Sequence, residues 1–373
     1  MTLRLPDQPS LSSLKYHAKQ IVKRHHAGDA GICDPLRSLH KWRSSSDAEI
    51  LHADLTLADA QHALALQYGF ANWLALRNHT LAADPTQTAD GALSLSEAQH
   101  DEFRHRGVLN LPGFLPKDII DPARELIHGV LEGAEVFREG KWTAQRRTGK
   151  LDYSVQSKLL KTLNFNTKRS PEFATICSAE LHNVAEQLMD GRSLITTVAR
   201  PQILFTAPNA ERWELPHKVW HMDIARLGNI GCPGVQMFTF IDQVDPGGAG
   251  TVVAAGSHHY VNDQGKVKSK DVKKQLRQSH PWFKGLFRPD GGDRHHYLDV
   301  PAHDGDIELQ VVELTGAPGD VWLMDLRVLH SLAPNTSNRA RLMASQRYYL
   351  PESLNAAYGD ASDAEGQPLQ EAY

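Results

Sequence analysis

Two residues in the segment 219–228, VWHMDIARLG, have the types and spacing of metal ligands: His221 and Asp223. An iron(II) site of the facial-triad type needs two imidazoles and one carboxylate on one face of an octahedron, which leaves three positions for other ligands. We interpret the segment as a strand, and alternate side chains of a strand project to the same side. His221 and Asp223 are therefore expected to lie together, with Met222 pointing away from them.

The His-x-Asp pattern alone is weak evidence for a metal site. In a chain with 20 histidines, about one such match is expected by chance. His52 and Asp54 match equally well, but they precede a helix cap and have no strand around them, so we interpret them as solvated surface residues. The remaining sequence must therefore distinguish His221 and Asp223 from this second match.

A later segment, 316–349, places another histidine in a suitable setting. It begins with a turn, continues as a hydrophobic strand that ends in His330, and passes through a Pro-Asn loop to Arg339 and Arg341, which lead into the next strand. An antiparallel sandwich routinely brings strands that are far apart in the sequence side by side. His330 can therefore lie beside His221 despite their wide separation along the chain.

Taken together, these residues resemble the phytanoyl-CoA dioxygenase family of Fe(II)/2-oxoglutarate oxygenases. The resemblance rests on His221-x-Asp223, the segment 247–259 (GGAGTVVAAGSHH), His330, and Arg341 eleven positions later. The segment 94–115, SLSEAQHDEFRHRGVLNLPGFL, is also similar to the usual start of that family. The resemblance extends from residue 94 to residue 350 and leaves the first part of the chain outside.

The resemblance implies both the cofactors and the chemistry. His221, Asp223 and His330 would be the catalytic iron(II) ligands, and Arg341 would bind the far carboxylate of the cosubstrate 2-oxoglutarate. Dioxygen would be consumed, succinate and carbon dioxide released, and an unactivated C–H bond of a small-molecule substrate hydroxylated. Halogenating members of the wider superfamily carry a small residue in place of the carboxylate, so Asp223 favours hydroxylation.

The chemistry of arginine agrees with the role that the resemblance gives to Arg341. A guanidinium is always charged and binds a carboxylate through two parallel hydrogen bonds, which suits an anchor for the end of 2-oxoglutarate remote from iron. Arg339 competes for this role through proximity alone. Its position in the loop, ahead of the strand, favours a structural role for Arg339 instead.

Three further residues are weaker candidates for the site. Thr239 lies in the strand after His-x-Asp and is a candidate to hydrogen-bond 2-oxoglutarate. The alternative is that Thr239 is an ordinary structural threonine on a half-buried strand face. Trp220 is a candidate to stack over the substrate, although tryptophan in a strand more often packs in a core. Arg226 is a candidate for an acidic substrate group, and solvation at the end of the strand is the alternative.

The elements that must position these residues fall into two parts. Residues 1–82 have helical periodicity, with Thr56 and Asp59 placed as a capping box, and form a small all-α N-terminal domain. The sequence of residues 57–79 resembles a helical module found ahead of bacterial ankyrin-repeat proteins, which implies a domain boundary. Residues 83–93 are polar and contain Pro and Gly, so we interpret them as a linker.

The second part, residues 94–355, changes from helices to many short strand-like runs separated by Gly, Pro and Asn. This order predicts an α+β domain whose core is a double-stranded β-helix, the jelly-roll or cupin-like fold, with flanking helices. The charged insertion 261–305 is expected to be a loop that acts as a lid over the barrel mouth and shapes the pocket. Residues 356–373 are expected to form a C-terminal tail.

Composition excludes several other classes of protein. Forty Lys and Arg against 44 Asp and Glu give a net charge of −4, which does not indicate nucleic acid or an anionic membrane as partner. Three cysteines without a CxxC pair favour a reducing compartment, and no apolar stretch is long enough for a signal peptide or a membrane span, so we expect a cytoplasmic protein.

Two alternatives to the oxygenase hypothesis stay open. One is a jelly-roll protein that keeps the metal for binding or sensing and has lost turnover. The other assigns the main role to the helical module, which would localise the oxygenase by docking to a protein partner or by self-association.

Overall fold

The structure is a computed structural model of the 373-residue chain. It describes residues 5, 11–70, 72–82, 86–87, 93–134, 137–138, 141–142, 153–198, 200–224, 231–261, 269–289 and 294–358. None of the described helices is long and apolar enough to cross a membrane.

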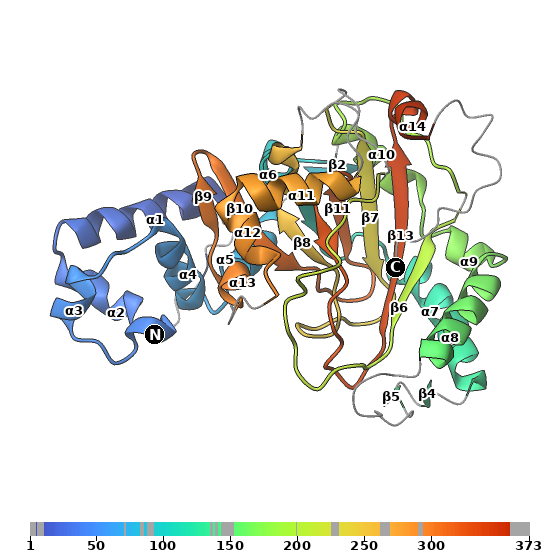
Figure 1. Ribbon diagram of the computed structural model, residues 1–373, viewed down its shortest axis with the longest axis horizontal. Helices are drawn as coiled ribbons and strands as arrows, with labels where there is room; N and C mark the ends of the chain where they lie inside the picture. The colour runs from blue at the N-terminus through green and yellow to red at the C-terminus, as the bar shows by residue number, and fades with distance from the viewer. Residues whose placement is uncertain are drawn as a thin grey trace.

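The N-terminal part is helical, as the sequence predicts, and lies to one side of the sheets (Figure 1). Two capping boxes begin its later helices: Ser46 with Glu49, and Thr56 with Asp59. The helices share a core of their own, which contains Leu14, Ile50, Leu64 and other buried apolar side chains. They are α1 (Leu11–His26), α2 (Cys33–Leu36), α3 (Asp47–His52), α4 (Leu57–Gln67) and α5 (Trp73–Ala82), with 3₁₀ turns at Ala30–Ile32 and His40–Trp42.

Two antiparallel sheets form the second part and confirm the predicted jelly-roll class. The larger sheet has the order β3-β11-β7-β13-β6, and the smaller sheet has the order β12-β8-β10-β9. The strands of the larger sheet are β3 (Val108–Leu111), β6 (Gln202–Thr206), β7 (Gly234–Phe240), β11 (Val321–Asp325) and β13 (Arg341–Tyr349). Those of the smaller sheet are β8 (Val252–Ala255), β9 (Ala302–Asp304), β10 (Ile307–Glu313) and β12 (His330–Ser331).

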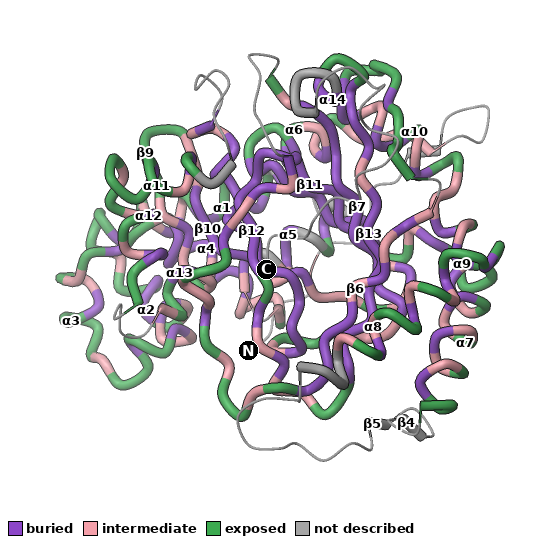
Figure 2. Tube along the Cα trace, turned by 45° about the vertical axis from the view of Figure 1, so that its right-hand side comes forward, coloured by how far each residue is buried: buried purple, intermediate pink, exposed green. Residues whose placement is uncertain are grey.

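Helices cover the outer face of the larger sheet, and their apolar sides join one large core with it (Figures 1 and 2). These helices are α7 (Lys117–Gly133), α8 (Tyr153–Thr167), α9 (Pro171–Ala174) and α10 (Ala179–Gln187). A separate cluster of apolar side chains lies between the two sheets, with Phe238, Val253 and Met343 among its members. Because side chains alternate along a strand, membership of these two clusters shows which strand positions face the interior of the barrel.

The expected linker contains regular structure, since residues of β1 (Thr86–Gln87) pair with β2 (Leu93–Ser94) within or beside it. Two-residue strands also pair at β4 (Phe137–Arg138) and β5 (Lys141–Trp142). The expected boundary at residue 355 falls within the last helix, α14 (Pro351–Tyr358), and the remainder of the expected tail lies outside the described residues.

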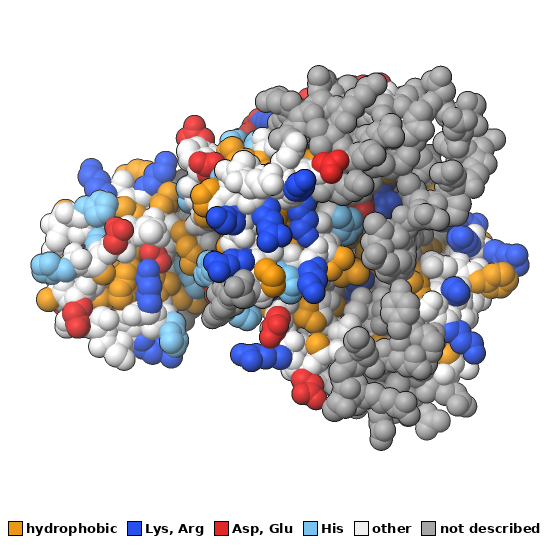
Figure 3. Space-filling model, in the orientation of Figure 1, with side chains coloured by type: hydrophobic (Ala, Val, Ile, Leu, Met, Phe, Trp, Pro, Cys, Tyr) orange, Lys and Arg blue, Asp and Glu red, His pale blue; other side chains and the backbone are white. Residues whose placement is uncertain are grey.

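The insertion 261–305 is not the loop that we expected. Its described residues form α11 (Ser269–Ser279), α12 (Pro281–Leu286) and α13 (His296–Asp299), which lead into β9. Apolar side chains of these helices, such as Val272 and Phe283, share a core with Val252 and Leu309 on the outer face of the smaller sheet. The charged residues that suggested a loop belong to the opposite face, where Lys and Arg side chains gather over α11 and α12 (Figure 3).

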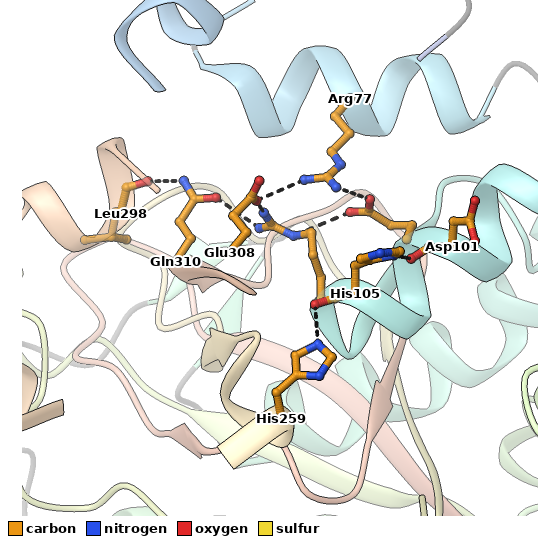
Figure 4. Close-up of polar contacts among 9 residues, drawn as sticks. Arg77, Asp101, His105, His259, Leu298, Glu308 and Gln310 are labelled. Atoms are coloured by element: carbon orange, nitrogen blue, oxygen red, sulfur yellow. Dashed lines mark hydrogen bonds and ion pairs between the residues drawn. The ribbon is translucent and has the colours of Figure 1, made fainter. Parts of the chain in front are cut away.

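A buried ionic network joins the N-terminal helices to the smaller sheet. Arg77 on α5 pairs with Glu102 on α6 (Glu97–Arg106) and, at 3.2 Å, with Glu308 on β10. Arg106 pairs with the same two carboxylates and donates a hydrogen bond to the Oε1 atom of Gln310 at 3.0 Å. Figure 4 shows Arg77 reaching down from its helix to Glu308. The network therefore ties three elements from both parts of the chain.

Candidate metal centre

The His221 segment is not a strand, contrary to our expectation. Among the described residues 219–224 only His221 has a ladder partner, an isolated antiparallel bridge to His330. In this bridge each of the two residues donates its main-chain N–H to the carbonyl oxygen of the other, at 2.9 Å in both directions. His330 itself lies on β12, which pairs with β8. One pair of hydrogen bonds thus fixes the two histidines opposite each other, with ring centroids 4.3 Å apart.

The structure brings the three expected ligands together, and it describes no other group of three His, Cys, Asp or Glu with this arrangement. The Nε2 atom of His221 lies 3.4 Å from the Oδ1 atom of Asp223, and the Nε2 atom of His330 lies 3.4 Å from its Oδ2 atom. Met222 is buried and joins the core beneath the insertion helices. The expected separation of Met222 from its two neighbours is therefore found, although the backbone is not a regular strand.

Both imidazole rings are oriented in the same way. The Nδ1 atom of His221 lies 2.9 Å from the carbonyl oxygen of Val219, and that of His330 lies 3.1 Å from the carbonyl oxygen of Val328. A carbonyl oxygen can only accept, so each Nδ1 carries the proton and donates it. When such a ring is neutral, its lone pair is on Nε2, the atom that faces Asp223, and this is the form that binds a metal.

The carboxyl group of Asp223 is ionised. Burial would raise its pKa, but His330, His221 and Arg347 more than offset that effect and hold the pKa well below its usual value. Burial likewise lowers the pKa of His221, and Asp223 reverses this and raises it. The charge of the carboxylate thus stabilises cations around it, and a metal ion is the cation that three converging ligands suit.

Arg341 begins β13, as expected, and is 3 % exposed. Its Nη1 atom donates to the carbonyl oxygen of Ala249 at 3.1 Å and approaches the hydroxyl of Thr251 at 3.5 Å. Its Nε atom has no hydrogen-bond partner among the described residues, and no ion pair of Arg341 occurs among them. Burial lowers the pKa of this guanidinium to about 10. A buried cation without an anionic partner marks a place for an anion.

Arg347 is a residue of the site that the sequence did not reveal. Its Nη2 and Nε atoms lie 2.7 and 3.1 Å from the Oδ2 atom of Asp223. It shares the inner face of β13 with Arg341 and Met343, because these positions differ by even numbers of residues. Strand periodicity counted forward from Arg341 would have indicated the face on which Arg347 lies.

Two of the weaker candidates do not belong to the site. Thr239 has the same parity on β7 as Met237, which packs against the outer helices, while Phe238 faces the interior. Its hydroxyl donates to the carbonyl oxygen of Asp320 at 2.9 Å, so Thr239 cannot take the role that we expected toward 2-oxoglutarate. Trp220 is 3 % exposed and donates from its Nε1 atom to the carbonyl oxygen of Pro216, so it packs in the core rather than at a pocket rim.

The other sequence candidates are accounted for briefly. Arg226 lies outside the described residues. His52 and Asp54 are exposed, and the Nδ1 atom of His52 lies 2.7 Å from the carbonyl oxygen of Ala48, which confirms that this second His-x-Asp belongs to the surface. Arg339 is exposed in the loop before β13, and its carbonyl oxygen accepts hydrogen bonds from Asn335 and Ser337.

Comparison with known families decides the assignment. Residues 103–343, more than half of the chain, match the family model described as "Phytanoyl-CoA dioxygenase (PhyH)". The chain belongs to the phytanoyl-CoA dioxygenase family. It is therefore an enzyme of the Fe(II)/2-oxoglutarate-dependent oxygenase superfamily, and the matched region contains His221, Asp223, His330 and Arg341.

Individual proteins are only distantly similar to this member of the phytanoyl-CoA dioxygenase family. No curated protein matches it. Among solved structures, AviO1 from Streptomyces viridochromogenes Tue57 has 18 % identity and a TM-score of 0.41 over 68 % of this chain and 94 % of its own. EctD from S. alaskensis with bound Fe has 18 % identity and a TM-score of 0.41 over 72 % and 83 %. HygX from Streptomyces hygroscopicus with nickel and 2-oxoglutarate bound has 15 % identity and a TM-score of 0.38 over 69 % of this chain and 88 % of its own.

The residues present fit the cofactors of the superfamily. Two imidazoles that present their Nε2 atoms and one carboxylate are the donor set of a non-haem iron(II) site with open positions. Arg341, buried without an anionic partner among the described residues, fits one end of a dicarboxylate.

Proposed function

We propose that the protein is an Fe(II)- and 2-oxoglutarate-dependent dioxygenase that hydroxylates an unactivated C–H bond of a small-molecule substrate and releases succinate and carbon dioxide. The observation that carries the proposal is the convergence of the two Nε2 atoms on Asp223, with both Nδ1 atoms engaged by carbonyl oxygens. Bound iron(II) would supply the activation of dioxygen, which protein side chains cannot perform.

The protein's own residues would prepare the site for that chemistry. His221, Asp223 and His330 would hold iron on one face and leave the opposite face open. Arg341 would bind the far carboxylate of 2-oxoglutarate and so fix the direction of the cosubstrate relative to the metal. Apolar side chains between the sheets, Phe238 and Val253 among them, would exclude water beside the ligands.

Hydroxylation is favoured over halogenation by the carboxylate itself. Asp223 occupies a ligand position that a halide needs in a halogenating relative, and its low pKa keeps it charged at neutral pH. Its ion pair with Arg347 holds it in the site. The substrate is a small molecule in this proposal, and nothing in the net charge of −4 indicates nucleic acid as a substrate.

The proposal is tested by metal binding and turnover of matched variants. The purified protein is expected to bind one Fe(II) and to form succinate from 2-oxoglutarate under air, and His221→Ala should abolish both. His52→Ala is the control, because it alters the exposed second His-x-Asp. Retention of iron by His221→Ala would refute the assignment of the ligands. Iron binding without any 2-oxoglutarate-dependent oxygen uptake would favour the alternative of a metal-binding or sensing protein.

We infer that residues 1–82 form a helical domain fixed to the oxygenase domain 94–355. The buried network of Arg77, Glu102, Arg106 and Glu308 supports this inference, because such a contact is costly to separate. The alternative of a docking module predicts that deletion of residues 1–90 removes association with a partner and leaves turnover unchanged. A fixed domain predicts that the same deletion reduces the yield of folded oxygenase, which size-exclusion chromatography would measure.

A further inference from the structure

The contact between Arg347 and Asp223 is one-sided. Both donor atoms of the guanidinium that reach the carboxylate, Nη2 at 2.7 Å and Nε at 3.1 Å, meet the same oxygen, Oδ2. The other oxygen, Oδ1, faces the Nε2 atom of His221 at 3.4 Å. A guanidinium that only neutralised the carboxylate would be expected to engage both oxygens in the parallel geometry that arginine favours.

This asymmetry bears on how a carboxylate binds a metal. With the Nε2 atoms of His221 and His330 each 3.4 Å from a different oxygen of Asp223, the carboxylate is placed where either oxygen, or both, can reach a shared metal. Two imidazoles and one carboxylate oxygen leave three positions of an octahedron open. A second carboxylate oxygen would close one of the three.

We propose that Arg347 is a positioning residue that keeps Asp223 a one-oxygen ligand of iron. The inference rests on the proposed function, because it concerns the same metal. Charge-assisted hydrogen bonds from Nη2 and Nε engage the lone pairs of Oδ2, so Oδ1 is the oxygen offered to the metal. The coordination position that Oδ2 would otherwise fill stays open for a gaseous ligand.

The fold gives Arg347 a fixed base for this role. Arg347 pairs in register with Gln236 on the neighbouring strand β7, and the Nε2 atom of Gln236 donates to the hydroxyl of Ser345 at 3.0 Å. The side chain of Arg347 is 23 % exposed and that of Asp223 is 14 % exposed, so water screens the pair only in part. Its ion pair with Asp223 separates its role from that of Arg341 on the same strand, which has no carboxylate partner among the described residues.

The test uses nitric oxide, which binds iron(II) only where a coordination position is open. Wild type, Arg347→Met, Arg347→Lys and the control Arg192→Met are loaded anaerobically with Fe(II) and 2-oxoglutarate, and nitric oxide is titrated with electron paramagnetic resonance as the readout. Arg192 is an exposed arginine that pairs with Glu352, so its loss tests removal of a guanidinium elsewhere on the protein. Iron affinity is measured in parallel by equilibrium dialysis.

Arg347→Met is expected to lower the affinity for nitric oxide about tenfold or more, because Oδ2 would compete for the position that nitric oxide needs; about tenfold is the smallest effect typical of lost outer-shell partners of metal ligands. Iron affinity is expected not to fall, because the second carboxylate oxygen would then also bind the metal. Arg347→Lys keeps the charge with a single donor site and should recover part of the affinity for nitric oxide, and Arg192→Met should behave as wild type. Unchanged nitric oxide affinity in both Arg347 variants, or a loss that follows lost iron, would overturn the inference alone. Failure of the wild type to hold iron would overturn the proposed function as well.

Discussion

Replacement of Arg77 by methionine is expected to destabilise the whole protein by about 3–5 kcal/mol, the range for breaking a buried ion pair by removing one partner. The side chains of Arg77, Glu102 and Arg106 are 4 %, 3 % and 1 % exposed, and that of Glu308 is 18 % exposed. Two guanidinium groups balance two carboxylates in the intact network. Without Arg77 both carboxylates would share Arg106, and one buried negative charge would be uncompensated.

A second estimate of the magnitude comes from Glu308. Burial would raise its pKa, but Arg106 and Arg77 lower it from 4.5 to about 2. A depression of that size corresponds to roughly 3 kcal/mol of stabilisation of the charged form in the folded protein. Arg77 is one of the two arginines that produce it, so the two estimates agree in order of magnitude.

The assay is urea unfolding at neutral pH, followed by both circular dichroism and tryptophan fluorescence, with Arg104→Met as the matched control. Arg104 lies on the same helix as Arg106, but its side chain is 53 % exposed and pairs with Glu97 and Asp101 at the surface. Its loss should change the free energy of unfolding by at most about 1 kcal/mol. If Arg77→Met also changed the free energy of unfolding by less than about 1 kcal/mol, or if only the N-terminal helices unfolded earlier, the helical domain and the oxygenase domain would not be coupled through this network.

Three further outcomes are expected. Arg341→Met should raise the KM for 2-oxoglutarate at least about tenfold, since a hydrogen bond to a charged group contributes about 1.5–3 kcal/mol. Arg339→Met in the exposed loop should leave this KM unchanged. Equal KM values for the two variants in steady-state assays would contradict the role of Arg341 as the anchor of 2-oxoglutarate. Gly256→Ala should lower the urea midpoint, because Gly256 has φ +86° and an added Cβ would meet the carbonyl oxygen of Glu308. The ion pairs of Glu308 should contribute fully to stability above pH about 4.5, and this contribution should be lost as pH falls toward about 2. Urea midpoints that do not fall over this pH range would exclude such a contribution.

The sequence predicted which side chains come together where chemistry restricts residue type. Two histidines and an aspartate were expected together, and the structure places them within reach of one ion. The capping box of Thr56 and Asp59 was equally predictable, because it depends on residues three positions apart. Both predictions rest on local spacing or on a motif.

Prediction was weaker where a residue's role depends on which face it occupies. All seven residues of β7 are buried, so alternation of polar and apolar residues could not show that Thr239 faces outward. In the insertion, the single apolar pair Val272 and Leu276, spaced as on one face of a helix, is surrounded by charged residues, which concealed α11. The Arg77 network joins residues more than 200 positions apart, as between Arg106 and Glu308, and no pattern in the sequence connects them.

The misassigned strand and the misassigned insertion have one physical explanation. The segment that carries His221 lacks a strand ladder, yet its buried side chains Trp220 and Met222 pack into the core that the insertion helices form. Lys273 on α11 donates a hydrogen bond to the carbonyl oxygen of Lys218, and Arg294 donates one to that of Leu215. The insertion helices therefore hold the ligand segment through its buried side chains, and the bridge to β12 holds it through its main chain. His221 and Asp223 project together because their neighbours are anchored in that core, so the metal site depends on the insertion as a scaffold.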